Sequence, residues 1–150
     1  MAIVTSHENP PFSAYSPSVH RRTSRRSIAA GGVVYYANYL KFMERARTEW
    51  LRAAGFELPE LARDHNVIFV VRSVAIEYLR PARLNDALRV TVHLEKIGSC
   101  TLDVLQSVER GDTRLAEARA QVVCVDHRAS FKPVRIPPFI RQQLESTSTA

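Results

Sequence analysis

The chain has 150 residues, which is the usual length of a single domain and argues against two domains. Hydrophobic residues make up 45% of the chain and charged residues 24%, a composition that excludes wholesale disorder. Half of the net charge of +6 lies in the first 30 residues, so the rest of the chain is only mildly basic and gives little reason to expect a nucleic-acid partner.

The first 28 residues are predicted to be a mostly unstructured basic segment. They show no sustained hydrophobic period, and three prolines lie among serines and arginines. The arginines at positions 21–26 could contact the phosphates of nucleic acid or anionic lipid, but no interleaved aromatic side chains are present for base stacking. We therefore interpret the segment as a tail, although its Arg- and Ser-rich composition also resembles a transit peptide.

A long helix is predicted to begin near Asn38, whose side chain suits an N-cap, and to end before Gly55. Its apolar residues recur at spacings of three and four and therefore form one buried stripe. The stripe consists of Tyr39, Phe42, Met43, Ala46, Trp50, Ala53 and Ala54. A shorter helix is predicted over residues 59–65, with Pro59 in its first turn.

At least four strands are predicted to follow as an antiparallel meander. Residues 67–78, 88–95, 102–108 and 115–125 carry runs or alternations of apolar side chains. Gly98-Ser99 and Gly111-Asp112 are predicted to be turns between them. One helical turn and a flexible tail over residues 141–150 complete the chain. A helix packed on one face of an antiparallel sheet is an α+β fold.

Cys100 and Cys124 lie in or beside predicted strands and are expected to be reduced thiols in a cytoplasmic protein. No second cysteine or histidine stands at metal-ligand spacing from either, so no metal site is predicted. No stretch approaches the roughly 20 apolar residues of a membrane span, and we expect no stable membrane insertion.

Residues 31–52, which read GGVVYYANYLKFMERARTEWLR, resemble the signature of the hot-dog-fold acyl-CoA thioesterases. The similarity is to the branch that contains the 4-hydroxybenzoyl-CoA thioesterases and the Tol-Pal-associated YbgC proteins. Residues 69–73, 78–86 and 122–126 resemble further family stretches in the same order. The resemblance implies an antiparallel sheet wrapped around one long helix, with two protomers joining their sheets into a dimer.

The resemblance also implies the parts of an active site. In the family, the backbone amide at the position of Tyr36 polarises the thioester carbonyl, a role suited to the start of a helix. Coenzyme A carries phosphates, so arginines near the mouth of the pocket are candidate ligands. The candidate substrate-binding residues are Gly31, Gly32, Val33, Asn38, Arg72, Ser73, Arg80 and Arg83.

The position of the family's catalytic aspartate is occupied by Ala29, which cannot activate water. Three explanations are open. The protein is an inactive relative that still binds acyl-CoA, or it recruits another acid, for which Glu44 and Glu77 are candidates. Alternatively, two compensating frameshifts in the gene have replaced the sequence of the family's first strand. When the codons of residues 22–28 are read two nucleotides late, they can encode most of the family motif.

The resulting hypothesis is an acyl-CoA thioester hydrolase whose domain spans residues 29–140 and whose products are a free acid and CoA. The resemblance implies no metal or redox cofactor, a homodimer or homotetramer, a cytoplasmic location and a link to the Tol-Pal cell-envelope system. The alternative is a catalytically inactive acyl-CoA-binding or interaction protein of the same fold, which the alanine at position 29 favours.

Overall fold

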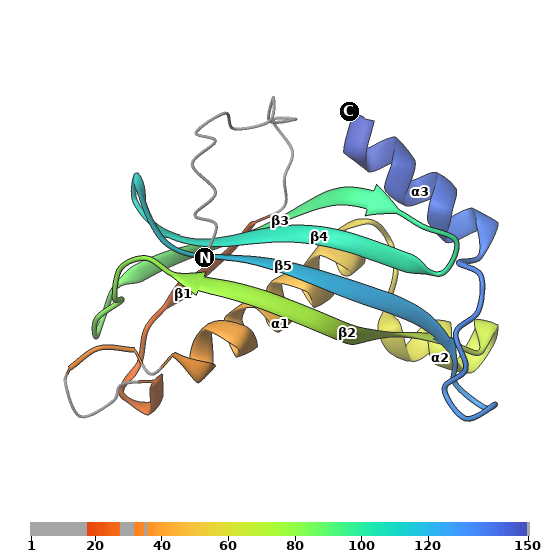
Figure 1. The fold of residues 1–150 in the computed structure, drawn as a ribbon, viewed down its shortest axis with the longest axis horizontal. Coiled ribbons are helices and arrows are strands. Elements are labelled where there is room, and N and C mark those ends of the chain that lie inside the picture. Colours follow the sequence, from red (N-terminus) through yellow and green to blue (C-terminus); the bar gives the residue numbers. More distant parts are fainter. Residues whose placement is uncertain (1–17, 28–31, 35, 150) are drawn as a thin grey trace.

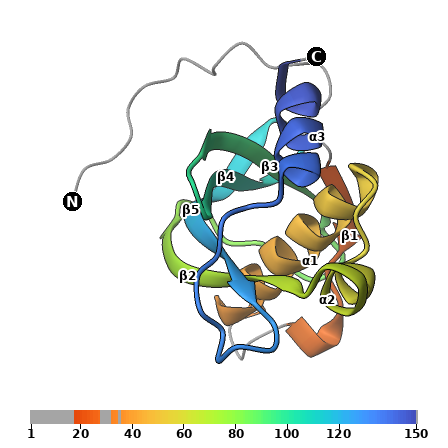
Figure 2. The same cartoon turned by 90° about the vertical axis from the view of Figure 1, so that its right-hand side faces the viewer.

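The computed structural model describes residues 18–27, 32–34 and 36–149 of the chain. Helix α1 (Ala37–Ala53) lies against the concave face of a 5-stranded antiparallel sheet, while α2 (Leu58–His65) and α3 (Pro138–Thr149) lie at one end (Figures 1 and 2). The strands are β1 (Ser18–Arg22), β2 (Val67–Tyr78), β3 (Ala87–Ile97), β4 (Thr101–Arg110) and β5 (Thr113–Asp126), in the spatial order β1-β3-β4-β5-β2. The predicted α+β class is confirmed.

Helix α1 forms where the apolar stripe predicted it. Phe42, Met43 and Trp50 are buried between the helix and the sheet. Gly55 follows the last turn with a φ of 97°, a conformation that favours glycine, so the predicted C-terminal stop is confirmed. The predicted N-cap is wrong by two residues, because the helix begins at Ala37 and Tyr36 is its N-cap. Asn38 therefore lies inside the first turn.

The meander from β3 to β5 follows the predicted turns. Residues Gly98 and Ser99 connect β3 to β4, and Gly111 connects β4 to β5 with a φ of 57°. Along β3, Val90 and Val92 are buried, whereas Arg89 is exposed. This alternation places one face of the sheet on α1 and leaves the other polar.

Strand β1 corrects the prediction that residues 1–28 lack structure, which is wrong for residues 18–27. Residues 18–22 pair with β3, and a 3-10 turn follows at Arg25–Ser27. Val19 packs against the core, and the guanidinium carbon of Arg21 lies 4.6 Å from the centre of the Phe42 ring. Strand β1 was missed in the sequence because four of its five side chains are polar or charged and show no apolar alternation. The remainder of that predicted segment lies outside the described residues.

Helix α3 corrects the prediction of a flexible tail after residue 140, since it continues to Thr149. Ile140 and Leu144 are completely buried, and Arg141 Nη2 donates a hydrogen bond to the carbonyl of Gly98 at 2.6 Å. These contacts, together with the ring of Phe139 against Phe56 and His65, hold α3 on the rest of the fold.

Strand β2 is an edge of the sheet with unusual exposure. Among the described residues it pairs only with β5, and the register shifts between Val71 and Ser73. Val70, Val71 and Val74 are each between 37% and 43% exposed. Apolar side chains on a free strand edge are uncommon in isolated proteins because the edge can pair with another chain.

Candidate functional site

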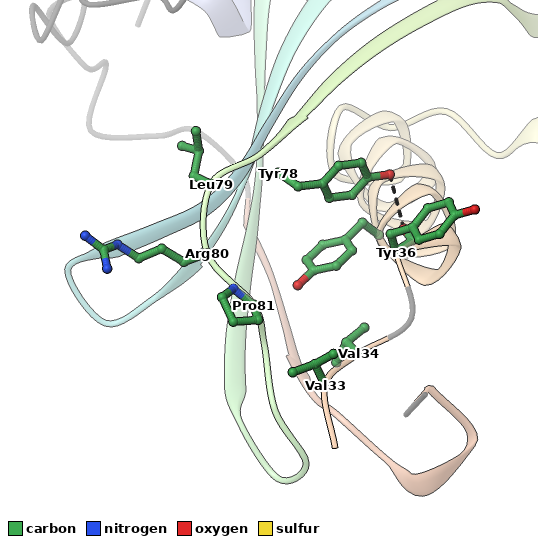
Figure 3. A pocket seen from close by; sticks show the side chains of 8 residues that line it. Val33, Val34, Tyr36, Tyr78, Leu79, Arg80 and Pro81 are labelled. Carbon is green, nitrogen blue, oxygen red and sulfur yellow. Dashed lines mark hydrogen bonds between the residues drawn. The ribbon is translucent and has the colours of Figure 1, made fainter. Parts of the chain in front are cut away.

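A cavity of about 360 Å³ lies at the N-terminal end of α1, which is within the size range of small-molecule sites. One wall is formed by Val33, Val34, Tyr36 and Tyr39, and the other by residues 78–81 at the end of β2 (Figure 3). Most of its surface is apolar. The cavity therefore suits a small hydrophobic or aromatic group.

Backbone hydrogen bonds join the two walls at one end of the cavity. The N–H of Val34 donates to the carbonyl of Ala82 at 2.7 Å, and the N–H of Ala82 donates to Tyr39 Oη at 3.0 Å. Val33 also forms an isolated antiparallel bridge with Arg83. These contacts fix the loop between β2 and β3 against the segment that leads into α1.

The start of α1 gives the cavity its polarity. Tyr36, the N-cap, lines the cavity and is 59% exposed. The first turn of a helix carries the positive end of its dipole, which attracts developing negative charge. Gly32, which precedes this segment, has a φ of 76°, so a side chain there would be strained.

The surroundings of two tyrosine hydroxyls of the site raise their pKa values. Burial raises the pKa of Tyr39, and desolvation, followed by the proximity of Tyr36 and Tyr39, raises the pKa of Tyr78. Tyr78 Oη donates to the carbonyl of Tyr36 at 3.3 Å, so this proton is already engaged within the site (Figure 3). What the site offers a bound group is the positive end of a helix beside an apolar wall, which suits an acyl carbonyl.

Four of the predicted site residues lie at or beside the cavity. Val33, Tyr36 and Arg80 line it, and Gly32 directly precedes Val33. The side chain of Arg80 points away from Tyr36 and Tyr78 (Figure 3). Its guanidinium is therefore placed outside the apolar part of the cavity.

The remaining described candidates lie elsewhere. Asn38 is half-buried in the first turn of α1, and Arg72 and Ser73 are exposed on the β2 edge. Arg83 contributes its backbone rather than its side chain, since its N–H donates to Asp86 Oδ2 at 2.7 Å. Ala29 and Gly31 lie outside the described residues.

The two acids considered as replacements for the missing aspartate do not line this cavity. Glu44 is exposed on α1, and Glu77 is paired in register with Glu117 of β5. Among the described residues, the cavity lining contains no carboxylate. The described lining of this cavity therefore supplies no attacking carboxylate.

Sequence reasoning missed Tyr39 and Tyr78 as members of the site. Tyr39 was assigned to the buried stripe of α1, and its burial is confirmed. Tyr39 is nevertheless part of the cavity lining, although it is buried. For Tyr78, the available signal was its position at the end of a strand beside a proline-containing loop.

Two further features bear on chemistry. Within the described ranges, no three His, Cys, Asp or Glu side chains gather in a cluster able to hold a metal ion. No helix in the same part of the chain is both long enough and apolar enough to cross a membrane.

Comparison with known proteins shows similarity over most of the chain. The model of the thioesterase-like superfamily matches residues 25–144. The acyl-CoA thioesterase YbgC of Haemophilus influenzae is 39% identical over 112 residues, which cover 75% of this chain and 82% of that protein. The acyl-CoA thioester hydrolase YbgC of Escherichia coli is 42% identical over 112 residues, or 74% of this chain and 82% of that protein.

A solved structure shares the fold described above. A "Probable Thioesterase" from Bartonella henselae superposes with a TM-score of 0.77 at 28% identity, covering 82% of this chain and all of that one. The expected hot-dog arrangement of a sheet around one long helix is thereby confirmed.

Proposed function

The chain belongs to the thioesterase-like superfamily, and from that premise we propose that it is an acyl-CoA thioester hydrolase, which converts acyl-CoA and water to a free acid and CoA. The observation that carries the proposal is the apolar cavity at the N-terminus of α1, in a chain 39% and 42% identical to relatives named for this activity. An apolar cavity next to a positive helix end favours an acyl group whose carbonyl becomes negatively charged during reaction.

We assign the role of carbonyl donor to the backbone N–H of Tyr36. Its position as the N-cap of α1, on the cavity wall, supports this role. The hydrogen bond would strengthen as the thioester oxygen gains charge, so it lowers the barrier rather than only binding substrate. The side chain of Arg80, directed away from the rings, is suited to contact a CoA phosphate outside the cavity.

We further propose a homodimer in which the β2 edges of two protomers pair. The exposed valines of β2 and its unpaired outer edge support this arrangement. Pairing would bring Arg72 and Ser73, which do not line the cavity at the start of α1, against the second protomer. They would then contribute to substrate binding from the partner. Two such dimers could associate as a homotetramer.

We also propose a cytoplasmic location, for which the free thiols of Cys100 and Cys124 are support. Cell fractionation with an antibody to the chain tests it. From the resemblance to YbgC proteins alone, we also propose a link to the Tol-Pal system. Co-purification of Tol-Pal components with the tagged chain, compared with a tagged unrelated hot-dog protein, tests that link.

The alternative function is binding of acyl-CoA without hydrolysis. Its basis is the alanine at position 29 and a described cavity lining that contains no carboxylate. The discriminating experiment measures CoA release from short-chain, long-chain and aromatic acyl-CoAs by the unmodified chain and by Ala29→Asp.

Turnover by the unmodified chain supports hydrolysis and shows that another group supplies the base. Turnover by Ala29→Asp alone supports the binding protein and shows that its site lacks only the acid. Failure of the unmodified chain to hydrolyse any acyl-CoA would overturn the proposed hydrolase function, and failure of both variants to bind any acyl-CoA would overturn the alternative as well. Resequencing of codons 19–30 separately tests the frameshift explanation, because codons unable to encode the family peptide in a shifted frame exclude it.

A further inference from the structure

Polar contacts between the two walls of the cavity occur at both of its ends. At one end, Ala82 holds Val34 and Tyr39 through two hydrogen bonds. At the other end, the contact is the hydrogen bond from Tyr78 Oη to the carbonyl of Tyr36, drawn as a dashed line in Figure 3. Tyr78 therefore connects the last residue of β2 to the residue that caps α1.

The carbonyl of Tyr36 accepts hydrogen bonds from both walls of the cavity. Tyr78 Oη donates to it at 3.3 Å, and the N–H of Tyr39, in the first turn of α1, donates to it at 3.2 Å. Two donors on one carbonyl restrict rotation of the peptide plane that follows Tyr36. This restriction fixes the backbone of Tyr36 relative to the opposite wall.

The ring of Tyr78 is itself held by its neighbours. Its centroid lies 5.9 Å from that of Tyr36 and 5.4 Å from that of Tyr39, and both pairs meet edge to face, at interplanar angles of 73° and 69°. Such contacts orient an aromatic ring as well as bury it. The hydroxyl is therefore aimed at the Tyr36 carbonyl by packing on two sides.

We propose that Tyr78 is a positioning residue of the site. By holding the Tyr36 carbonyl it limits rotation at the Cα of Tyr36, and through that Cα it restricts the direction in which the Tyr36 N–H, on the preceding peptide plane, points toward the thioester carbonyl. The inference rests on the proposed hydrolase function. Donors stabilise an oxyanion only when they lie within about 0.5 Å of the productive position, so a loosened Tyr36 would slow the reaction more than it weakens binding. Because Tyr78 ends β2, it also links the proposed dimer edge to this amide.

The test is the substitution Tyr78→Phe, which keeps the ring and removes the hydroxyl. We expect kcat to fall about threefold to tenfold, the loss typical of one neutral hydrogen bond, with KM changed by less than about twofold. The measurement uses whichever of the unmodified chain or Ala29→Asp turns over. Tyr78→Leu, which also removes the wall of the cavity, should raise KM as well.

Thr48→Val is the matched control. Thr48 Oγ1 also donates to a backbone carbonyl of α1, that of Glu44 at 3.2 Å, but it lies away from the cavity. Loss of that hydrogen bond should leave both kcat and KM unchanged. An unchanged kcat in Tyr78→Phe, or an equal fall in Thr48→Val, would overturn the inference.

A second measurement does not depend on turnover. Amide hydrogen exchange of Tyr39, whose N–H shares the Tyr36 carbonyl, should accelerate severalfold in Tyr78→Phe and not in Thr48→Val. If neither background hydrolyses acyl-CoA, the proposed function fails, and exchange alone decides the inference. Unchanged Tyr39 exchange in Tyr78→Phe then overturns it.

Discussion

Thr23 and Asp86 exchange two hydrogen bonds across the end of the sheet. The N–H of Thr23 donates to the carbonyl of Asp86 at 3.0 Å, and the N–H of Asp86 donates to Thr23 Oγ1 at 3.0 Å. The Thr23 hydroxyl in turn donates to the carbonyl of Arg83. The loop between β2 and β3 thereby holds the end of β1 as well as the segment that enters α1.

Thr23→Val is expected to lower the free energy of unfolding by about 1–3 kcal/mol. Thr23 is 2% exposed, and valine would leave the partners of its hydroxyl buried without a hydrogen bond. Urea denaturation measures the effect. Thr113→Val, at a half-buried position beside the β4–β5 turn, is the isosteric control and should change stability by less than about 0.5 kcal/mol. Equal losses in both variants would contradict the assignment.

The Asp86 carboxylate should make stability depend on acid pH. Desolvation acts to raise its pKa, but hydrogen bonds from the Arg83 N–H and from Arg110 lower the pKa below its ordinary value of 3.8. The carboxylate therefore stabilises the fold fully above that ordinary value, and its contribution is lost as pH falls through the depressed pKa.

Asp86→Asn should accordingly destabilise the protein at neutral pH, and the difference from the unmodified chain should shrink as pH falls below about 4. Thermal unfolding between pH 3 and pH 7 measures this difference. Asp112→Asn, in the exposed turn after Gly111, makes the same change in charge and is the control. A difference that stays constant with pH would refute the stabilising role of the ionised carboxylate.

Gln106 and Arg47 should show strong energetic coupling. Gln106 is 1% exposed, donates from Nε2 to the carbonyl of Met43 at 2.9 Å and accepts from Arg47 Nη1 at 2.8 Å. Burial lowers the pKa of Arg47, as expected for a guanidinium removed from water. Gln106→Leu should cost about 1–3 kcal/mol, because it leaves that guanidinium without its acceptor.

The double variant Gln106→Leu/Arg47→Met should lose less stability than the sum of the two single variants, because it removes both members of the pair. A double-mutant cycle in urea measures the difference. Simple additivity of the two losses would show that the hydrogen bond does not couple them.

Cys124 should resist thiol reagents in the folded protein. Burial, together with the neighbouring Cys100, raises its pKa to about 11, and only the thiolate reacts readily. Maleimide labelling followed by mass spectrometry should modify the half-buried Cys100 first and Cys124 only on unfolding. In the Cys100→Ser variant, Cys124 is the one remaining cysteine, so the labelling rate of Cys124 is measured alone. Rapid labelling of that folded variant would contradict the prediction.

Val74→Glu should convert the proposed dimer to monomer. A carboxylate on the β2 edge of each protomer would place two like charges near the paired edges. Sedimentation velocity measures the change. Phe131→Glu introduces the same charge at another exposed apolar residue, 58% exposed after β5, and should leave the oligomer intact. A dimer that persists in Val74→Glu and dissociates in Phe131→Glu would locate the interface elsewhere.

The central helix and the meander could be predicted because their patterns are local. Residues 37–53 carry a stripe with a period of 3.6, and β3 alternates over a continuous run. Strand β1 could not be predicted this way, because Arg21 reaches its aromatic partner, Phe42, only after folding. The last helix was also missed, since Ile140 and Leu144 are its only fully buried apolar residues in a Ser- and Thr-rich end.

Only those residues of the site that lie close together in the sequence could be predicted as a group. Val33 and Tyr36 are close in sequence, so the segment before α1 could be singled out. The opposite wall comes from Tyr78 and the loop after it, about forty residues away, and its position depends on the register between β2 and β5. A register cannot be derived from either strand alone.

The exposed edge of β2 also bears on the fate of the chain before assembly. A strand of 12 residues with several exposed valines offers a template for unlimited strand addition, the first step of aggregation. Pairing of two identical β2 edges about a twofold axis covers both of these templates, so neither β2 edge remains open to a third chain. Variants of this edge should therefore be recognised first by poor solubility during expression, before any loss of activity is measured.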